Sequence, residues 1–334
     1  MKKVLVMVLV ALLALGCIGS FAMAEEPIKI TVIIKATDSD FWQQLVVGAK
    51  NFEFDHADEV VVDIQGPVSE ADTDEQAAIL DTVVVNHPDG IVLAPTLFDN
   101  CVAGIEAAAA AGIPVVICDN KPNSDKFITE YATDSYAAGG ELGKVFLDEL
   151  IARGVEPNGV VGLITSTAGS DTLQKREGGF IDYLKENAPD ITVLPNVYVD
   201  NDIPTALAEA ENIYTANQEN LLGYFASNNC TGDGLAQFMT EHNLGDKLVS
   251  VVFDSDEAEI NAIREGQLLA TAVQSPYNMG YNGCQAIYDV VTGATTADDY
   301  EEFTDTGATI VTQENVDDPD MVGVIDPFTL KLYE

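Results

Sequence analysis

Basic side chains are scarce in this 334-residue chain. Lys and Arg together number 15 against 55 Asp and Glu, so the formal net charge is −40. Such a chain repels polyphosphates, which excludes a nucleic-acid groove, and it offers no basic patch for docking on anionic lipid. Hydrophobic residues make up 47% of the sequence, so the acidity is not that of a disordered acidic segment. The composition predicts a folded protein whose ligand is not anionic.

Histidine, tryptophan and cysteine are also few. With three His and a single Trp, Trp42, the chain is not expected to hold a His-based metal site or catalytic triad. The cysteines beyond the first segment match neither a metal-binding knuckle nor a CxxC redox pair. We predict four small, buried thiols and no cofactor or metal. These cysteines are Cys101, Cys118, Cys230 and Cys284.

The first 24 residues have the features of a secretory signal peptide. Lys2 and Lys3 precede an apolar run at 4–15, and Ala22 and Ala24 then place small residues at the two positions that signal peptidase reads. The run is shorter than the roughly 20 residues that a membrane-spanning helix needs. A second interpretation is a lipoprotein signal in which Cys17 of LALGC carries the lipid. Both predict an exported protein, periplasmic or extracellular, and the second anchors it to the cell surface.

Short runs rich in Val and Ile alternate with helical patterns along the rest of the chain. Uninterrupted apolar runs are typical of strands covered on both faces. Strict alternation predicts parallel sheets with right-handed crossovers, and about ten strands predict two lobes rather than one. The expected strands are residues 28–36, 59–64, 89–94, 113–118, 160–165, 191–199, 222–226, 247–253 and 268–273. The expected helices are residues 40–53, 71–86, 100–111, 173–186, 204–217, 232–242, 258–265 and 280–292.

Polar and aromatic residues follow these strands, where doubly wound sheets bind their ligands. Neither GxGxxG nor GxxxxGK follows any strand, which disfavours a nucleotide. Carboxylates and amides together offer sugar hydroxyls both acceptors and donors, and an aromatic ring packs on the apolar face of a sugar. A neutral polyhydroxylated ligand is therefore predicted, although Phe41 and Trp42 could equally be core residues. The strand-end residues are 38–42, 95–96, 119–120, 166–171, 228–229, Asp254 and Gln274.

Six segments carry a family resemblance. They are DSDFWQQLVVGAK, DGIVLAP, AAAAAGIPVVICDN, SDTLQKREGGF, YFASNN and VVFDSDEAEINAIREGQLLATAVQSPYNMG. In this order they resemble the exported sugar-binding proteins of ABC importers, of the ribose-binding type. The resemblance extends from residue 28 to about residue 312.

The resemblance implies the type I periplasmic binding fold. This fold has two doubly wound, Rossmann-like α/β lobes with parallel sheets, joined by a three-strand hinge. The crossovers would fall near Thr133, near Gln274 and at 305–308. The N-terminal lobe would then be residues 25–133 plus 275–307, and the C-terminal lobe residues 134–274 plus 308–334, after the signal peptide 1–24.

The resemblance also implies the ligand-binding residues. Phe41 and Trp42 match the aromatics that sandwich the sugar, and Gln274 lies close to the hinge. Asn120, Gln174 and Asn201 stand where relatives carry Arg, Arg and an aromatic ring, so ribose itself is not favoured over another pentose, a hexose or a cyclitol. Asp254 has a second interpretation as a helix N-cap. The implied ligand residues are Phe41, Trp42, Asp119, Asn120, Gln174, Arg176, Asn201, Asn228, Asp254 and Gln274, with Ser39 as a further candidate.

We therefore predict a monomeric, non-catalytic receptor that captures a monosaccharide or polyol and delivers it to a membrane permease of the ABC type. A receptor for a membrane chemosensor or sensor kinase would use the same cleft. A secreted carbohydrate-active enzyme would need two flanking carboxylates, and the pairs Asp38/Asp40 and Asp254/Asp256 each lie in one loop. A sugar-responsive repressor is excluded by the leader at 1–24 and by the sign of the charge.

Overall fold

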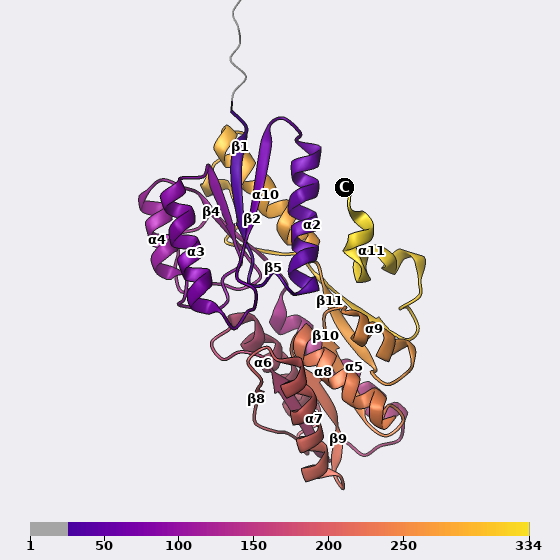
Figure 1. The fold of residues 1–334 in the computed structure, drawn as a ribbon. Helices are drawn as coiled ribbons and strands as arrows, with labels where there is room; N and C mark the ends of the chain where they lie inside the picture. The colour runs from indigo at the N-terminus through magenta and orange to yellow at the C-terminus, as the bar shows by residue number, and fades with distance from the viewer. Residues whose placement is uncertain (1–25, 334) are drawn as a thin grey trace, which may run out of the picture.

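The computed structural model describes residues 26–333 and places their strands in two sheets (Figure 1). The proposed leader and Cys17 lie outside the described residues. The first sheet has the order β12-β5-β4-β3-β1-β2, and its strands are β1 (Ile28–Ile33), β2 (Val60–Gln65), β3 (Gly90–Leu93), β4 (Val115–Cys118), β5 (Glu130–Ala132) and β12 (Phe303–Asp305). The second has the order β13-β11-β10-β9-β6-β7, with β8 paired to β6. Its strands are β6 (Gly159–Thr165), β7 (Ile191–Val193), β8 (Val197–Tyr198), β9 (Leu221–Ala226), β10 (Val249–Phe253), β11 (Ala270–Gln274) and β13 (Ala308–Thr312).

Helices cover both faces of each sheet. The "first unit" is the first sheet together with the helices α2 (Asp40–Asp55), α3 (Thr73–Asn86), α4 (Val102–Ala110) and α10 (Pro276–Thr292). The "second unit" is the second sheet together with the helices α5 (Ser135–Ala152), α6 (Asp171–Asn187), α7 (Ile203–Asn217), α8 (Asn229–His242) and α9 (Glu257–Arg264). The short helices are η1 (Ala297–Asp299), η2 (Pro319–Met321), α11 (Val322–Ile325) and η3 (Pro327–Leu330). Among residues 26–333, no helix combines the length and the apolarity that crossing a membrane demands.

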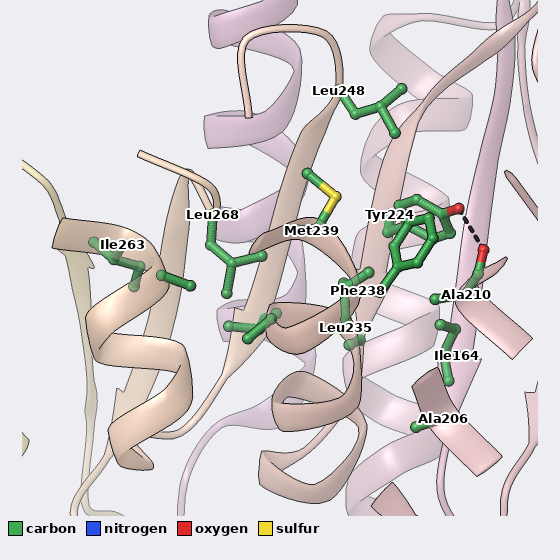
Figure 2. Packing of buried hydrophobic residues seen from close by; sticks show 14 of the residues in the cluster. Ile164, Ala206, Ala210, Tyr224, Leu235, Phe238, Met239, Leu248, Ile263 and Leu268 are labelled. Atoms are coloured by element: carbon green, nitrogen blue, oxygen red, sulfur yellow. Dashed lines mark hydrogen bonds between the residues drawn. The ribbon is translucent and has the colours of Figure 1, made fainter. Parts of the chain in front are cut away.

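The apolar strands are buried on both sides, as their uninterrupted Val and Ile runs predict. In the second unit, one core lies under α7, α8 and α9, and the other under α5 and α6. Figure 2 shows the first of these cores around Tyr224, whose hydroxyl donates to the Ala210 carbonyl oxygen at 2.7 Å. That bond allows the phenol to be fully buried without an unpaired polar atom.

Up to the end of β13, the chain passes between the units three times, at residues 133–134, at Ser275 and at 306–307. β12 and β13 are separated by only two residues but belong to different sheets. With no crossover helix between them, β13 pairs antiparallel with β11. The second sheet is therefore mixed, whereas the sequence pattern predicted only parallel pairing.

The C-terminal tail does not stay with the second unit. Met321, Val324 and Ile325 pack on its core, but the chain then returns to α2. Asn51 on α2 donates to the Leu330 carbonyl oxygen at 2.8 Å and accepts from the Leu332 amide at 2.9 Å. The tail that was expected in the second lobe, at 308–334, therefore contacts both units.

Helices α5 and α6 approach closely enough to require glycine. A Cβ on Gly139 of α5 would lie 2.1 Å from the Arg176 carbonyl oxygen on α6, and one on Gly179 of α6 would lie 2.0 Å from the Tyr136 carbonyl oxygen. Backbone atoms cannot yield as the end of a flexible side chain can. This contact sets the position of α6 and therefore of Arg176.

The Gly139→Ala variant should lose about 1–3 kcal/mol of unfolding free energy, because the added methyl group overpacks the helix contact. Gly140→Ala is the matched control, because its Cβ would have no neighbour nearer than 3.7 Å. A better helix former at that position should be neutral or stabilising by up to about 1 kcal/mol. Urea unfolding of both variants measures the difference, and equal stabilities would contradict the close approach.

Candidate ligand-binding cleft

A small cavity of about 30 Å³ lies between the two units, at the carboxyl ends of strands from both sheets. This is the position at which open α/β sheets bind ligands. The first unit contributes Lys35, Phe41, Trp42, Glu70, Thr96 and Asp119. The second unit contributes Thr167, Ser170, Thr172, Leu173, Arg176, Asn228, Asn229 and Asp254, and Gln274 lies at the connection between the units.

Asp119 and Asp254 occupy equivalent places in the two sheets. Asp119 follows β4 with φ of 64°, and Asp254 follows β10 with φ of 79°. Aspartate is one of the few residues that tolerates this left-handed conformation, which costs energy and is typical of functional positions. In each case a buried carboxylate results at the edge of the sheet.

A buried ion pair lines the cavity on the side of the first unit. The Lys35 ammonium lies 2.6 Å from Asp119 Oδ2, and both side chains are about 5% exposed. Removing either partner would leave an uncompensated charge in the interior, so the two must be considered together.

Arg176 reaches the cavity from α6 and lies between the two aspartates. Its guanidinium nitrogens lie 4.0 Å from Asp119 and 4.0 Å from Asp254, and Nη1 donates to the Ser227 carbonyl oxygen at 2.8 Å. The guanidinium carbon lies 4.3 Å from the centre of the Phe253 ring. Its Nε has no hydrogen-bond partner among the described residues although the side chain is only 2% exposed.

Asp254 and Gln274 form a second hydrogen-bonded pair. Gln274 Nε2 donates to Asp254 Oδ1 at 2.7 Å, and the Asn229 amide donates to Oδ2 at 3.0 Å. Burial raises the pKa of Asp254, and the positive charge of Arg176 opposes that shift. Gln274 Oε1 is buried and accepts no bond from residues 26–333. The N-cap interpretation of Asp254 is wrong, because Asp256 is the N-cap of α9.

Phe41 and Trp42 line the cavity and are also core residues. They are 6% and 2% exposed, pack edge to face with ring centres 4.7 Å apart, and belong to the apolar cluster under α2 and α10. The two interpretations that the sequence left open are thus compatible.

Asn228 lines the cavity and caps α8. Its Oδ1 accepts from the Thr231 amide at 3.2 Å, and its Nδ2 donates to Asn201 Oδ1 at 3.1 Å. Asn201 does not itself line the cavity, and its oxygen also accepts from Ser166 Oγ. Asn201 therefore orients Asn228 instead of closing the cavity.

Hydrogen bonds across the cleft hold the two units in a closed arrangement. Asn120 lies behind the cavity wall, and its Oδ1 accepts from Ser170 Oγ at 3.2 Å and from the Thr172 amide at 3.0 Å. Thr172 Oγ1 donates to the Asp119 carbonyl oxygen at 2.6 Å. At the rim, Asn229 Nδ2 donates to Ser39 Oγ at 3.2 Å. Asn120 and Ser39 are thus placed to join the units and not to line the cavity.

Gln174, a candidate from the sequence, does not line the cavity. It lies on α6 two residues before Arg176, is exposed, and is absent from the cavity lining. Residues two apart on a helix lie on nearly opposite faces, so only one of the pair can face the cleft. The buried one is Arg176.

Several lining residues were not singled out from the sequence. Thr96, Thr167, Ser170 and Asn229 belong to segments that follow strands, so their neighbourhood was predicted. Lys35 and Glu70 were not predicted as site residues from the sequence, although a lysine at the end of the apolar run IKITVIIK is unusual.

Cys118 and Cys230 do not line the cavity, and all four described cysteines are free and buried, as predicted. Within residues 26–333, no group of three or more His, Cys, Asp or Glu is arranged to hold a metal ion.

Known proteins share this sequence and fold. The family model described as a periplasmic binding protein domain matches residues 30–295. The chain belongs to this family, as a sugar-binding protein of the ABC-transporter type. A carbohydrate-transporter solute-binding protein from Agrobacterium radiobacter, solved in complex with D-arabinose, is 31% identical, with a TM-score of 0.84 over 90% of this chain and 99% of its own.

Two further relatives support the assignment. An ABC-transporter solute-binding protein from Agrobacterium vitis with bound D-fucose is 29% identical, with a TM-score of 0.82 over 89% of this chain and 99% of its own. The D-allose-binding periplasmic protein of Escherichia coli is 27% identical over 81% of this chain and 86% of its own. The family binds solutes without transforming them, which confirms the prediction that the protein is not an enzyme.

This periplasmic binding protein also carries a cluster of carboxyl groups beside the cavity, because Asn229, which lines it, donates to Asp256 Oδ2 at 3.1 Å. Asp233 on α8, Asp256 at the start of α9 and Asp40 on α2 of the first unit face one another. Burial, followed by the neighbouring carboxylates, raises the pKa of Asp233 to about 8. The same causes raise the pKa of Asp256 to about 6.

The cluster should make the protein less stable as the pH rises. A carboxyl group whose pKa is higher in the folded than in the unfolded state stabilises the fold only while it is protonated, and that contribution is lost as the pH passes the folded pKa. Ordinary carboxyls are ionised by about pH 6. The melting temperature should therefore fall between pH 6 and 8, and Glu130, with a pKa raised by burial to about 7, should contribute to that fall.

The Asp233→Asn variant should reduce this fall by roughly 2–4 °C, because it removes one of the mutually repelling charges. Asp190→Asn at an exposed position is the matched control and should keep the wild-type profile. Differential scanning fluorimetry from pH 5 to pH 9 compares the three proteins. Melting temperatures that change with pH in the same way in all three proteins would show that the cluster is ionised in the folded state.

Proposed function

We propose that this protein captures a neutral monosaccharide, a pentose, hexose or cyclitol, between its two units and delivers it to an ABC permease. The proposal rests chiefly on two buried polar atoms, Arg176 Nε and Gln274 Oε1, which lack hydrogen-bond partners within residues 26–333. Buried polar groups are normally paired, and both residues line the cavity. A ring with several hydroxyls supplies a donor for one and an acceptor for the other.

The composition of the cavity supports a neutral ligand. Charged side chains of both signs are already present, and the aromatic pair Phe41 and Trp42 provides an apolar surface. Relatives of this chain were solved with D-arabinose and with D-fucose, which are neutral sugars.

Capture would proceed by hinge closure. We propose lobes made of residues 25–133 plus 275–307 and of residues 134–274 plus the first part of the tail, which turn about the three connections. The hydrogen bonds of Asn120 and Ser39 across the cleft form only when the lobes meet. A bound sugar that contacts both lobes would stabilise that form by differential contact.

The proposal also covers the cellular location of the protein and its oligomeric state. The family is periplasmic and exported, and we propose that the mature protein acts as a monomer, either free or anchored through Cys17.

Thermal-shift screening against D-arabinose, D-fucose, D-ribose, D-allose, D-tagatose and myo-inositol tests the proposal. At least one should raise the melting temperature by several degrees when present at about 100 times its dissociation constant. The same ligand should change the fluorescence of Trp42, the single tryptophan of the chain. If none of these compounds has either effect, the proposed ligand class is wrong.

The Arg176→Lys variant should bind that ligand about 10- to 100-fold more weakly, because an ammonium cannot reproduce the bonds of the guanidinium fork. Gln174→Ala is the matched control, since it changes the exposed face of the same helix. Isothermal titration calorimetry should find its affinity unchanged. Equal losses in both variants would point to a general effect on α6.

A further inference from the structure

Glu70 lies on the loop between β2 and α3 and lines the cavity. The loop is attached to the segment that precedes α2, because the Thr37 amide donates to the Pro67 carbonyl oxygen at 2.9 Å and the Asp38 amide donates to that of Val68 at 3.4 Å. Backbone bonds therefore bring Glu70 to the first turn of α2. No pattern in the sequence indicates this approach.

Glu70 is bonded to the aromatic wall. Trp42 Nε1 donates to Glu70 Oε1 at 2.5 Å. The indole N–H is the only hydrogen-bond donor of the Trp42 side chain. The bond to Glu70 therefore fixes the orientation of the Trp42 ring, which is 2% exposed. The Lys35 ammonium lies 5.1 Å from the centre of the same ring, on the cavity side of the first unit.

Glu70 also decides the balance of charge in the cavity. The other charged side chains that line it are two cations, Lys35 and Arg176, and two carboxylates, Asp119 and Asp254. The cations are already near these carboxylates, at 2.6 Å and 4.0 Å. Glu70 adds a third carboxyl group. Burial raises the pKa of Glu70, and the positive charge of Lys35, which is already paired with Asp119, opposes that shift. The cavity lining therefore has three carboxyl groups against two cations.

We propose that Glu70 is the specificity-determining residue of the cleft, which positions Trp42 as a platform for the sugar ring and excludes sugar acids by like-charge repulsion. This inference rests on the proposed function. It assigns the discrimination between a neutral sugar and its uronic acid to one side chain. Like charges brought together in a site of low polarity are strongly disfavoured, and the neutral sugar meets no such penalty.

The positioning role can be tested without a ligand, because Trp42 and Glu70 belong to the same unit. Glu70→Gln keeps an acceptor for the indole and removes the charge, whereas Glu70→Ala removes both. The emission maximum of Trp42 should be retained in Glu70→Gln and shifted to longer wavelength in Glu70→Ala. Identical emission in wild type and Glu70→Ala would overturn the positioning role.

The selectivity role is tested by pairing D-galacturonate with D-fucose and with D-galactose, two neutral sugars that share its ring stereochemistry and differ from it at C6. By calorimetry, the wild type should bind the acid of each pair at least 100-fold more weakly than the neutral sugar. In Glu70→Gln, the ratio of the affinity for the neutral sugar to the affinity for the acid should be smaller than in the wild type by about 10-fold or more. Glu75→Gln on the exposed face of α3 removes the same charge outside the cavity and should keep the wild-type ratio.

The outcomes separate the two proposals. A wild type that binds none of the neutral sugars contradicts the proposed function itself. A wild type that binds a neutral sugar, together with a Glu70→Gln variant whose ratio is unchanged, overturns the role of Glu70 alone. Equal narrowing in Glu75→Gln would assign the effect to the net charge of the protein and would likewise refute the proposal.

Discussion

The Asp119–Asn120 pair at the end of β4 is the constraint on which the rest of the cleft depends. The left-handed conformation of Asp119 turns the chain at the sheet edge, so that its carboxylate meets Lys35 and its carbonyl oxygen meets Thr172. Asn120 then satisfies a backbone amide in the first turn of α6, which would otherwise lack a partner. The end of β4 thus positions both the Lys35–Asp119 ion pair and the first turn of α6, the helix that carries Arg176.

The charges of the cleft and of the surface have separate roles. The net charge of −40 is spread over a chain whose cavity contains only three of its carboxylates. Inside the cavity each aspartate is matched by a cation or by amide donors, which compensates the cost of burying it. Most of the net charge therefore lies outside the cavity, and net charge far from zero generally favours solubility.

The fold was predictable where local patterns carry it. The apolar runs predicted eight of the longer strands, and strand ends indicated Asp119, Asn228 and Asp254. The failures have physical causes. The run 191–199 divides into β7 and β8 around Pro195, which cannot donate to a ladder. Helix α5 was not assigned, and β5 has only three residues, too few for a pattern. The register of α6 and the approach of Glu70 depend on tertiary contacts, namely the glycine contact with α5 and the bonds of the β2–α3 loop.

Joining the two units has favourable and unfavourable contributions. Closure forms hydrogen bonds at Asn120 and Ser39, each with a net contribution of about 0.5–1.5 kcal/mol. It also removes Arg176 Nε and Gln274 Oε1 from water without giving them partners among the described residues, at about 1–3 kcal/mol for each group. These two contributions are opposite in sign. A ligand that pairs with both atoms removes the penalty and leaves the gain, and it therefore converts its contacts directly into closure.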